Sequence, residues 1–370
     1  MDVSFFKTFQ SPHFSFLGKE KSVLGIDLGS ASVKLVQVKL SEEHAKLETY
    51  GELATGPYGG KNIGQGVRLS NEKETEVLVD LVRETGATSK DAVVSMPLRH
   101  SFVTTVEIPR STGEDINSIM QFEARRYIPI PISEVVMDWW QVPDLGFDEE
   151  GTVASPAKTA TQVILVAVPK EVLDKYKRIV ADAGLTVAAF EIEVFSFIRS
   201  LLGRERAGVL VVDFGALSTK IALLDQGIIR VNHSIEKGMQ DITIALSESL
   251  SIGFERAEIL KREVGMSSRM EHQEIMKVIN PLIDFLLIEI ERFVVGYTRK
   301  HKGTVSKIII GGGGALMQGL SDHMVKKFGV EVLTGSPFTR LEYPAFFQPV
   351  LKETGPSFAV AVGLALRGLK

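Results

Sequence analysis

A short strand, an aspartate, a glycine turn and a second strand occur twice in this chain. In the first copy, apolar residues lead into Gly25-Ile26-Asp27-Leu28-Gly29-Ser30, and an alternating segment, Ser32 to Lys39, follows the turn. The second copy, Val212-Asp213-Phe214-Gly215-Ala216-Leu217-Ser218-Thr219, places its aspartate 186 residues after the first. A repeat of this kind predicts two lobes of related α/β fold, each opened by one copy.

Each turn offers groups that can hold a metal triphosphate. A carboxylate at a strand end, as at Asp27 and Asp213, can bind water molecules of a magnesium ion, and turn amides can bind phosphate oxygens. One copy alone could be an ordinary hairpin, but two facing turns would clamp the phosphates between the lobes. The other candidate phosphate ligands are Gly29, Ser30, Ser32 and Lys34 in the first copy, and Gly215, Ser218 and Thr219 in the second.

A glycine-rich loop and a helical pair supply candidate nucleoside contacts. The strand Ile308–Ile310 runs into four glycines, whose bare backbone suits a purine and ribose, and we expect a helix from Ala315. The loop comes too late for a dinucleotide fold, and no P-loop Gly-Lys-Ser exists. Glu258 and Lys261 share a helix face and could bind nucleoside hydroxyls or form a surface ion pair. The four glycines are Gly311, Gly312, Gly313 and Gly314.

Between the two copies, the pattern predicts a compact strand, helix, strand, strand, helix module. Its expected helix from Gly113 to Tyr127 begins with the acidic Glu114 and Asp115, and its hairpin loop covers 143–160. The expected organisation is a tail at 1–21; a first lobe at 22–100 and 185–206 with the final helix 357–370; an inserted module at 101–184; a second lobe at 207–262 and 303–356; and a small helical subdomain at 263–302.

Composition excludes several classes of function. The net charge of -4 gives no overall positive field for nucleic acid, and the absence of cysteine excludes disulfides and thiolate zinc sites. No uncharged apolar run is long enough to span a bilayer, so we expect no transmembrane segment. The tail carries five phenylalanines without the pattern of a signal peptide, and either a loose tail or a docking patch would explain them.

The order of these features resembles the superfamily of actin, sugar kinases and heat-shock chaperones. Residues 25–34, and Phe122-Glu123-Ala124-Arg125-Arg126-Tyr127-Ile128-Pro129 followed by Val135-Val136-Met137-Asp138, resemble the PilM family of type IV pilus assembly proteins and the related FtsA division proteins. The resemblance implies a two-lobed actin-like (ribonuclease H-like) ATPase fold, with ATP and magnesium in the cleft and an SHS2-like module inserted in the first lobe.

The resemblance also implies a role. Members of the PilM family are cytoplasmic adaptors that are peripheral to the inner membrane, bind the N-terminal peptide of a PilN-like membrane protein between the first lobe and the module, and couple to the pilus motor ATPase. Ala216 and Leu217 replace a glycine and a hydroxyl residue common in active relatives, so we expect ATP binding with at most slow hydrolysis. Glu193 is the candidate to position a water molecule or the hydration shell of the metal, with a helix cap or a surface role as the alternatives.

Three other functions remain open at this stage. An FtsA-like division or cytoskeletal protein is the nearest, although the chain stops at Lys370 without a basic amphipathic helix, which favours the adaptor. A small-molecule kinase would need a further catalytic aspartate beside the phosphates. A filament or another homo-oligomer has no sequence motif, so sedimentation with ATP would have to detect it.

Overall fold

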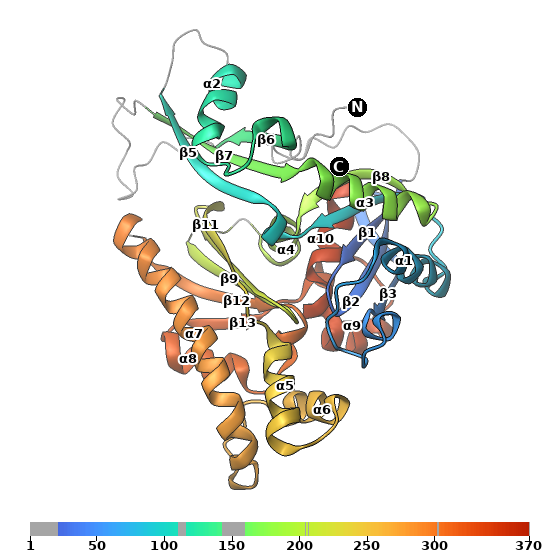
Figure 1. Cartoon of the computed structure of the whole chain (residues 1–370), viewed down its shortest axis with the longest axis vertical. Helices are drawn as coiled ribbons and strands as arrows, with labels where there is room; N and C mark the ends of the chain where they lie inside the picture. The colour runs from blue at the N-terminus through green and yellow to red at the C-terminus, as the bar shows by residue number, and fades with distance from the viewer. Residues whose placement is uncertain are drawn as a thin grey trace.

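Three β-sheets form the framework of the molecule (Figure 1). The computed structural model describes residues 21–109, 116–142, 160–203, 205, 207–301 and 303–369. The phenylalanines of the expected tail, the acidic helix start at Glu114 and Asp115, and nearly all of the expected hairpin loop lie outside the described residues.

The first sheet has the strand order β3-β2-β1-β4-β8. Its first three strands are antiparallel neighbours, and β4 and β8 run parallel to β1. Asp27 on β1 lies directly opposite Lys34 on β2. The strands are β1 (Ser22–Leu28), β2 (Ser32–Ser41), β3 (His44–Ala54), β4 (Asp91–Met96) and β8 (Thr186–Ile192).

The second sheet repeats this topology with the order β11-β10-β9-β12-β13. Three antiparallel strands are again followed by two parallel ones, and Asp213 lies opposite Lys220 as Asp27 lies opposite Lys34. The two-lobed α/β fold expected from the internal repeat is therefore confirmed. The strands are β9 (Gly208–Phe214), β10 (Thr219–Asp225), β11 (Ile228–Ile235), β12 (Val305–Gly311) and β13 (Glu331–Thr334).

Helices from distant parts of the chain complete the core of the first lobe. The last helix packs directly on β1, because Gly25 has no Cβ to collide with the Ala361 carbonyl. The helix that contains Arg199 is joined to the last helix through Glu191 of the sheet. Glu191 is fully buried and pairs with Arg199 and with Arg367 of the last helix. These helices are α1 (Asn71–Thr85), α3 (Lys170–Asp182), α4 (Glu193–Leu201) and α10 (Ala359–Gly368).

The second lobe carries its own helices. The expected break near Gly253 occurs, since Ser251 adopts a left-handed conformation and the next helix begins at Phe254. The segment expected to hold one or two long helices is a single one, and its buried isoleucines and leucines join the core of the second sheet. The helices are α5 (Met239–Leu250), α6 (Phe254–Val264), α7 (Gln273–His301) and α8 (Leu320–Phe328). The helix α9 (Gln348–Thr354), which was expected in the second lobe, instead packs its buried Leu351 into the core of the first lobe.

The helix predicted from Ala315 is wrong. Residues Gly313–Leu316 form only a 3₁₀ turn, and α8 begins at Leu320. The reason is that Met317 is extended and buried in the core, and Gly319 then takes a left-handed conformation. The chain must therefore turn again before it can become helical.

The inserted module has a small sheet with the order β5-β7-β6 and a separate core. Trp139 packs in that core, whereas Trp140 faces the other way and meets the Phe195 ring edge-on at 5.3 Å. Its C-terminal helix α3 packs into the core of the first lobe instead of the small core. The other elements are β5 (Phe102–Pro109), α2 (Ile116–Glu123), β6 (Val135–Gln141) and β7 (Ala160–Pro169).

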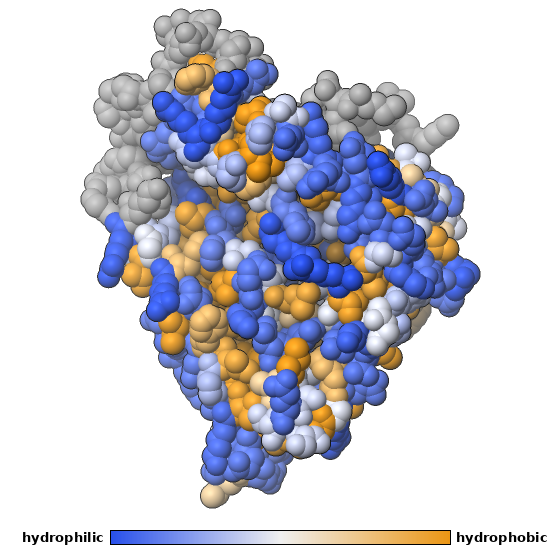
Figure 2. Space-filling view, in the orientation of Figure 1, coloured by the Kyte–Doolittle hydropathy of each residue, from blue (hydrophilic) through white to orange (hydrophobic). Residues whose placement is uncertain are grey.

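The surface mixes hydrophilic and hydrophobic residues over the face shown in Figure 2. Exposed apolar side chains such as Phe285, Ile288 and Val295 on α7 are interspersed with charged ones. Across the described parts of the chain, no helix combines the length and the apolar content needed to cross a bilayer.

Candidate functional site

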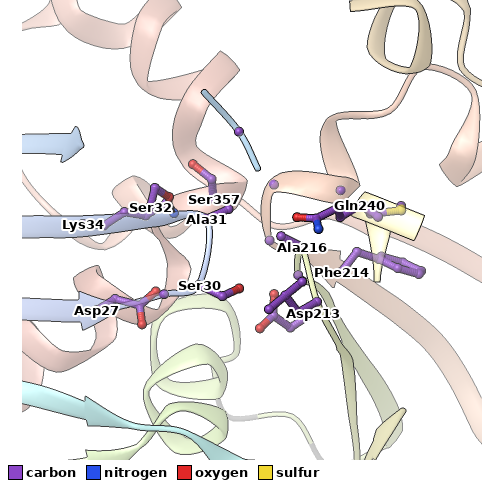
Figure 3. Close-up of a pocket in the computed structure, with 18 of the residues that line it drawn as sticks. Asp27, Ser30, Ala31, Ser32, Lys34, Asp213, Phe214, Ala216, Gln240 and Ser357 are labelled. Atoms are coloured by element: carbon purple, nitrogen blue, oxygen red, sulfur yellow. Dashed lines mark hydrogen bonds between the residues drawn. The ribbon is translucent and has the colours of Figure 1, made fainter. Parts of the chain in front are cut away.

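A cavity of about 430 Å³ lies between the two sheets, where the two glycine turns face each other. Asp27 and Ser30 project from one side, and Asp213 and Ala216 lie on the other (Figure 3). The structure thus brings together most residues that the sequence singled out. The predicted residues that line the cavity are Asp27, Gly29, Ser30, Ser32, Lys34, Glu193, Asp213, Gly215, Ser218, Glu258, Lys261, Gly312, Gly313 and Gly314.

Two predicted residues lie behind this lining. The Thr219 side chain is fully buried, and its hydroxyl donates a hydrogen bond to the Lys237 carbonyl at 3.0 Å. Gly311 belongs to β12, where an added Cβ would come within 2.6 Å of the Phe197 ring. Both residues support the walls of the cavity by packing.

The first turn holds a buried carboxylate that has a hydroxyl partner. Asp27 accepts a hydrogen bond from the Ser95 hydroxyl at 3.0 Å. Burial raises the pKa of the Asp27 carboxyl to about 6, in spite of the opposing field of Lys34. The Lys34 ammonium lies 3.2 Å from Glu52 and donates to the Ser32 hydroxyl, so it is directed to the rim of the cavity.

The second turn holds its carboxylate in a buried ion network. The Lys220 ammonium lies 3.2 Å from Asp213 and 2.9 Å from Glu193, and so joins the two lobes. Burial alone would lower the pKa of Lys220, but Asp213 and Glu193 outweigh it and raise that pKa. The ammonium therefore stays charged at the centre of the site.

Glu193 is the first residue of α4, and its carboxylate has two structural partners. One oxygen accepts a hydrogen bond from the Leu98 amide at 2.8 Å, and the other pairs with Lys220. The side chain is buried at the cavity wall, so a surface role is excluded. The Glu193 carboxylate therefore joins the start of α4 to two other elements. These are the turn after β4, through Leu98, and the second sheet, through Lys220.

The helical pair that could bind a nucleoside is buried as well. Lys261 is 5% exposed and donates to Glu258 at 2.6 Å and to the Thr243 hydroxyl at 2.9 Å. Burial would raise the pKa of Glu258, but Lys261 and its other donors lower it. With so little exposure, the alternative of a solvated surface ion pair does not fit.

The glycine loop brings backbone close to the second turn. Gly312 has a φ of 78°, and an added Cβ there would overlap an oxygen of Asp213. Gly314 fits tightly against Met239 and Phe214, while a Cβ at Gly313 would meet nothing within 4 Å. The loop therefore presents a flat stretch of backbone to the cavity.

Sequence reasoning missed several lining residues. A signal for Lys220 existed, because it follows Asp213 by the same seven positions as Lys34 follows Asp27. Glu52 and Gln240 had no such signal, since each depends on contacts across the tertiary fold. Among the described residues, no cluster of three histidine or acidic side chains suited to a metal ion occurs.

A second cavity of about 340 Å³ separates the module from the second sheet. The edge strand β5 supplies Phe102 and Val103, and the edge strand β11 supplies Asn232 and His233. Tyr127, which belongs to one of the family-like stretches, also lines it. Leu98 of the first lobe lines it too, so the cavity reaches the place where the first lobe meets the module.

With this geometry in view, similarity to known proteins is informative. The family model for the type IV pilus assembly protein PilM matches residues 25–369. The chain belongs to the PilM family. Membership covers both lobes and the module, and it accounts for the Phe122–Pro129 stretch.

Other relatives of this PilM-family chain are cell division proteins. FtsA of Enterococcus hirae is 21% identical over 268 residues, covering 67% of this chain and 59% of that protein. FtsA of Neisseria meningitidis serogroup B is 25% identical over 243 residues, covering 58% of each. The chain therefore spans less than two-thirds of the length of these curated relatives.

Solved structures show the same fold. A structure described as a PilM-PilN type IV pilus biogenesis complex matches with a TM-score of 0.78 and 24% identity, covering 94% of this chain and 98% of that one. MreB 5 of Spiroplasma citri bound to AMPPNP matches with a TM-score of 0.52 and 13% identity, covering 94% and 95%. The two-lobed actin-like fold expected from the sequence is thereby confirmed.

Proposed function

We propose that this PilM-family protein is an ATP-binding adaptor of the inner-membrane assembly platform of a type IV pilus or a related machine. The observation that carries the ATP part is the pair of duplicated turns that face each other across one cavity. The phosphates bind the turn amides and hydroxyls, and the nucleoside lies between Glu258, Lys261 and the glycine loop. MreB 5, which shares the fold, was solved with AMPPNP.

The residues present fit a magnesium ion that accompanies ATP. Asp27 is partly buried at the cavity wall with a raised pKa, a state that a nearby cation would relieve. Asp213 already has an ammonium partner in Lys220 and would contribute through water. When bound, magnesium neutralises phosphate charge, while the chain's own carboxylates and hydroxyls orient it.

Hydrolysis is slow in this proposal. Glu193 is held by the Leu98 amide and by Lys220, so it is poorly placed to accept a proton from water. Ala216 and Leu217 offer no side-chain donor to charge that develops on the phosphate. We expect turnover at or below about 1 per second, near the bottom of the usual enzyme range. Brisk phosphate release by the purified protein alone would contradict it.

Isothermal titration with ATP, with and without magnesium, tests the binding site. We expect magnesium-dependent binding tighter than about millimolar. Asp27→Ala should lose more magnesium-dependent affinity than Glu258→Ala, because the latter removes one nucleoside hydrogen bond of about 1–3 kcal/mol. A folded protein without magnesium-dependent binding would refute the ATP site.

The proposed partner is a PilN-like inner-membrane protein, whose N-terminal peptide binds where the first lobe meets the module. The PilM-PilN complex shares the fold over almost the whole chain. An extended peptide would gain backbone hydrogen bonds from an edge strand such as β5 and specificity from apolar pockets. Coupling to the pilus motor ATPase, localisation at the cytoplasmic face of the membrane and homo-oligomerisation belong to the same proposal.

Hydrogen exchange of the full chain with the N-terminal PilN peptide tests this placement. We expect protection in residues 102–109 and in the adjoining first lobe, with a scrambled peptide as control. Protection confined to the second lobe would refute the site, and an absence of binding by fluorescence anisotropy would refute the adaptor role.

A further inference from the structure

A glycine-rich segment of the first lobe crosses to the second lobe at the cavity. This segment, residues 60–69, is here called the strap. It contains Gly60, Gly64 and Gly66, and the first two have φ values of 67° and 81°, which glycine adopts without strain. Its Ile63 and Gly64 line the cavity, and the Ile63 side chain is 63% exposed.

The root of the strap is tied to the first glycine turn. The Val67 amide donates to the Ser30 carbonyl at 3.0 Å. The Thr55 hydroxyl, just before the strap, donates to the same carbonyl at 2.7 Å. A movement of Ser30 on the phosphate turn is therefore transmitted to the strap through the Val67 bond, while the Thr55 bond ties the preceding segment to the same carbonyl.

The residue before Val67 bonds the strap to the second lobe. The Gly66 amide donates to the side-chain oxygen of Gln240, which extends from α5 into the cavity (Figure 3). At Gly64, an added Cβ would lie 3.8 Å from the Glu258 side chain. The strap thus spans the cavity beside the residues assigned to the nucleoside.

Leu217 packs under the strap. An added Cβ at Gly66 would lie 3.0 Å from Leu217 Cγ and 3.0 Å from the Gln240 oxygen. The apolar Leu217 side chain therefore supports the strap by packing against it.

We propose that the strap is a latch over the nucleoside end of the cleft, closed by Gln240 and Leu217, which controls how fast nucleotide is taken up and released. This inference rests on the proposed ATP site and adds residues to it. Ile63 supplies an apolar cover at the cavity, and a bond to one side chain, that of Gln240, is weak enough for the opening to be reversible. Nucleotide exchange then requires the Gly66 to Gln240 bond to break.

Gln240→Ala removes the latch bond and leaves the strap sequence intact. With a fluorescent ATP analogue in stopped flow, we expect release about tenfold faster than in the unmodified protein, as the loss of one hydrogen bond implies. Hydrogen exchange of the Gly66 region, measured without nucleotide, should accelerate in parallel. The matched control is Gln273→Ala, an exposed glutamine at the start of α7, for which both rates should stay unchanged.

A disulfide provides the opposite change. The chain has no cysteine, so Gly66→Cys with Leu217→Cys introduces the only pair, at positions close enough to be bridged. The oxidised form should exchange nucleotide at least tenfold more slowly than the same protein after reduction. Equal rates in the two forms, or unchanged release in Gln240→Ala, would overturn the latch.

The two proposals fail in different ways. If the unmodified protein binds no nucleotide at all, the ATP site itself is refuted. If it binds nucleotide, but neither the missing bond nor the disulfide alters release, only the latch is refuted. Faster exchange of the Gly66 region without faster release would also refute the latch, because the strap would then open without controlling the cleft.

Discussion

The two glycine turns share one backbone design but place their charges differently. In both, a lysine seven residues after the aspartate lies opposite it in the sheet. Lys220 is directed to the centre and bridges Asp213 and Glu193, whereas Lys34 is directed to the rim and pairs with the half-exposed Glu52. Duplication thus conserved the geometry, while the neighbouring elements decided which turn is neutralised and which keeps a costly buried carboxylate.

Replacement of the two lysines should give the largest difference in the free energy of unfolding. Lys220→Met leaves Asp213 and Glu193 buried without their ammonium, so the free energy of unfolding should fall by about 3–5 kcal/mol. Lys34→Met, the matched substitution in the first turn, removes a buried ammonium but leaves the half-exposed Glu52 free to be hydrated, so it should cost less, about 1–2 kcal/mol. Denaturant unfolding measures both, and equal losses would contradict the asymmetry.

Replacement of each aspartate by asparagine should change the free energy of unfolding in opposite directions. At pH 8 without nucleotide, Asp27→Asn should raise the free energy of unfolding, by at most about 3 kcal/mol, because the folded pKa of about 6 exceeds the ordinary aspartate value of 3.8. The penalty on the wild type accumulates between about pH 4 and pH 6 and is constant above, so the gain should vanish below about pH 4.

Asp213→Asn, the same substitution in the second turn, is the control for Asp27→Asn. It removes a partner of Lys220, so it should destabilise the protein at pH 8. Thermal unfolding of both variants between pH 4 and pH 8 measures the difference. An Asp27→Asn variant that is less stable than wild type throughout would show that burial does not dominate the first turn.

The glycines of the two turns should behave alike. An added Cβ at Gly29 would lie 2.7 Å from the Ser32 carbonyl, and one at Gly215 would lie 2.8 Å from the Ser218 carbonyl. Alanine at either position should therefore cost about 1–3 kcal/mol through overpacking. Gly296→Ala on α7, where a Cβ meets nothing within 4 Å, is the control and should not destabilise. Markedly unequal losses would show that the turns differ in backbone too.

The smallest effect concerns the hydroxyl beside Asp27. Ser95→Ala removes the hydrogen bonds that Ser95 makes with Asp27 and with the Leu28 amide, and should cost about 1 kcal/mol. It should also raise the pKa of Asp27 further, because that hydrogen bond favours the charged form. Carboxyl titration by NMR would show the change, and an unchanged pKa would remove Ser95 from the explanation.

Much of this site could be predicted because it consists of local patterns. A strand, an aspartate and a glycine turn are adjacent in sequence, so two copies indicated both lobes and both aspartates. The pairing of the charged groups could not be predicted in the same way. Glu193 was a candidate, but its contacts with Leu98 and Lys220 depend on elements that are distant in the sequence. The helix expected from Ala315 failed for a similar reason: the burial of Met317 depends on the tertiary core.

The packing of α10 on β1 also has a consequence for biosynthesis. The apolar residues of β1 leave the ribosome long before the helix that covers Gly25, because the other strands of both sheets are synthesised between them. At about 5–20 residues per second, the strand waits on the order of tens of seconds for its cover. The first lobe thus cannot complete its core before α10 has been made, and a nascent chain should need protection from aggregation there until then.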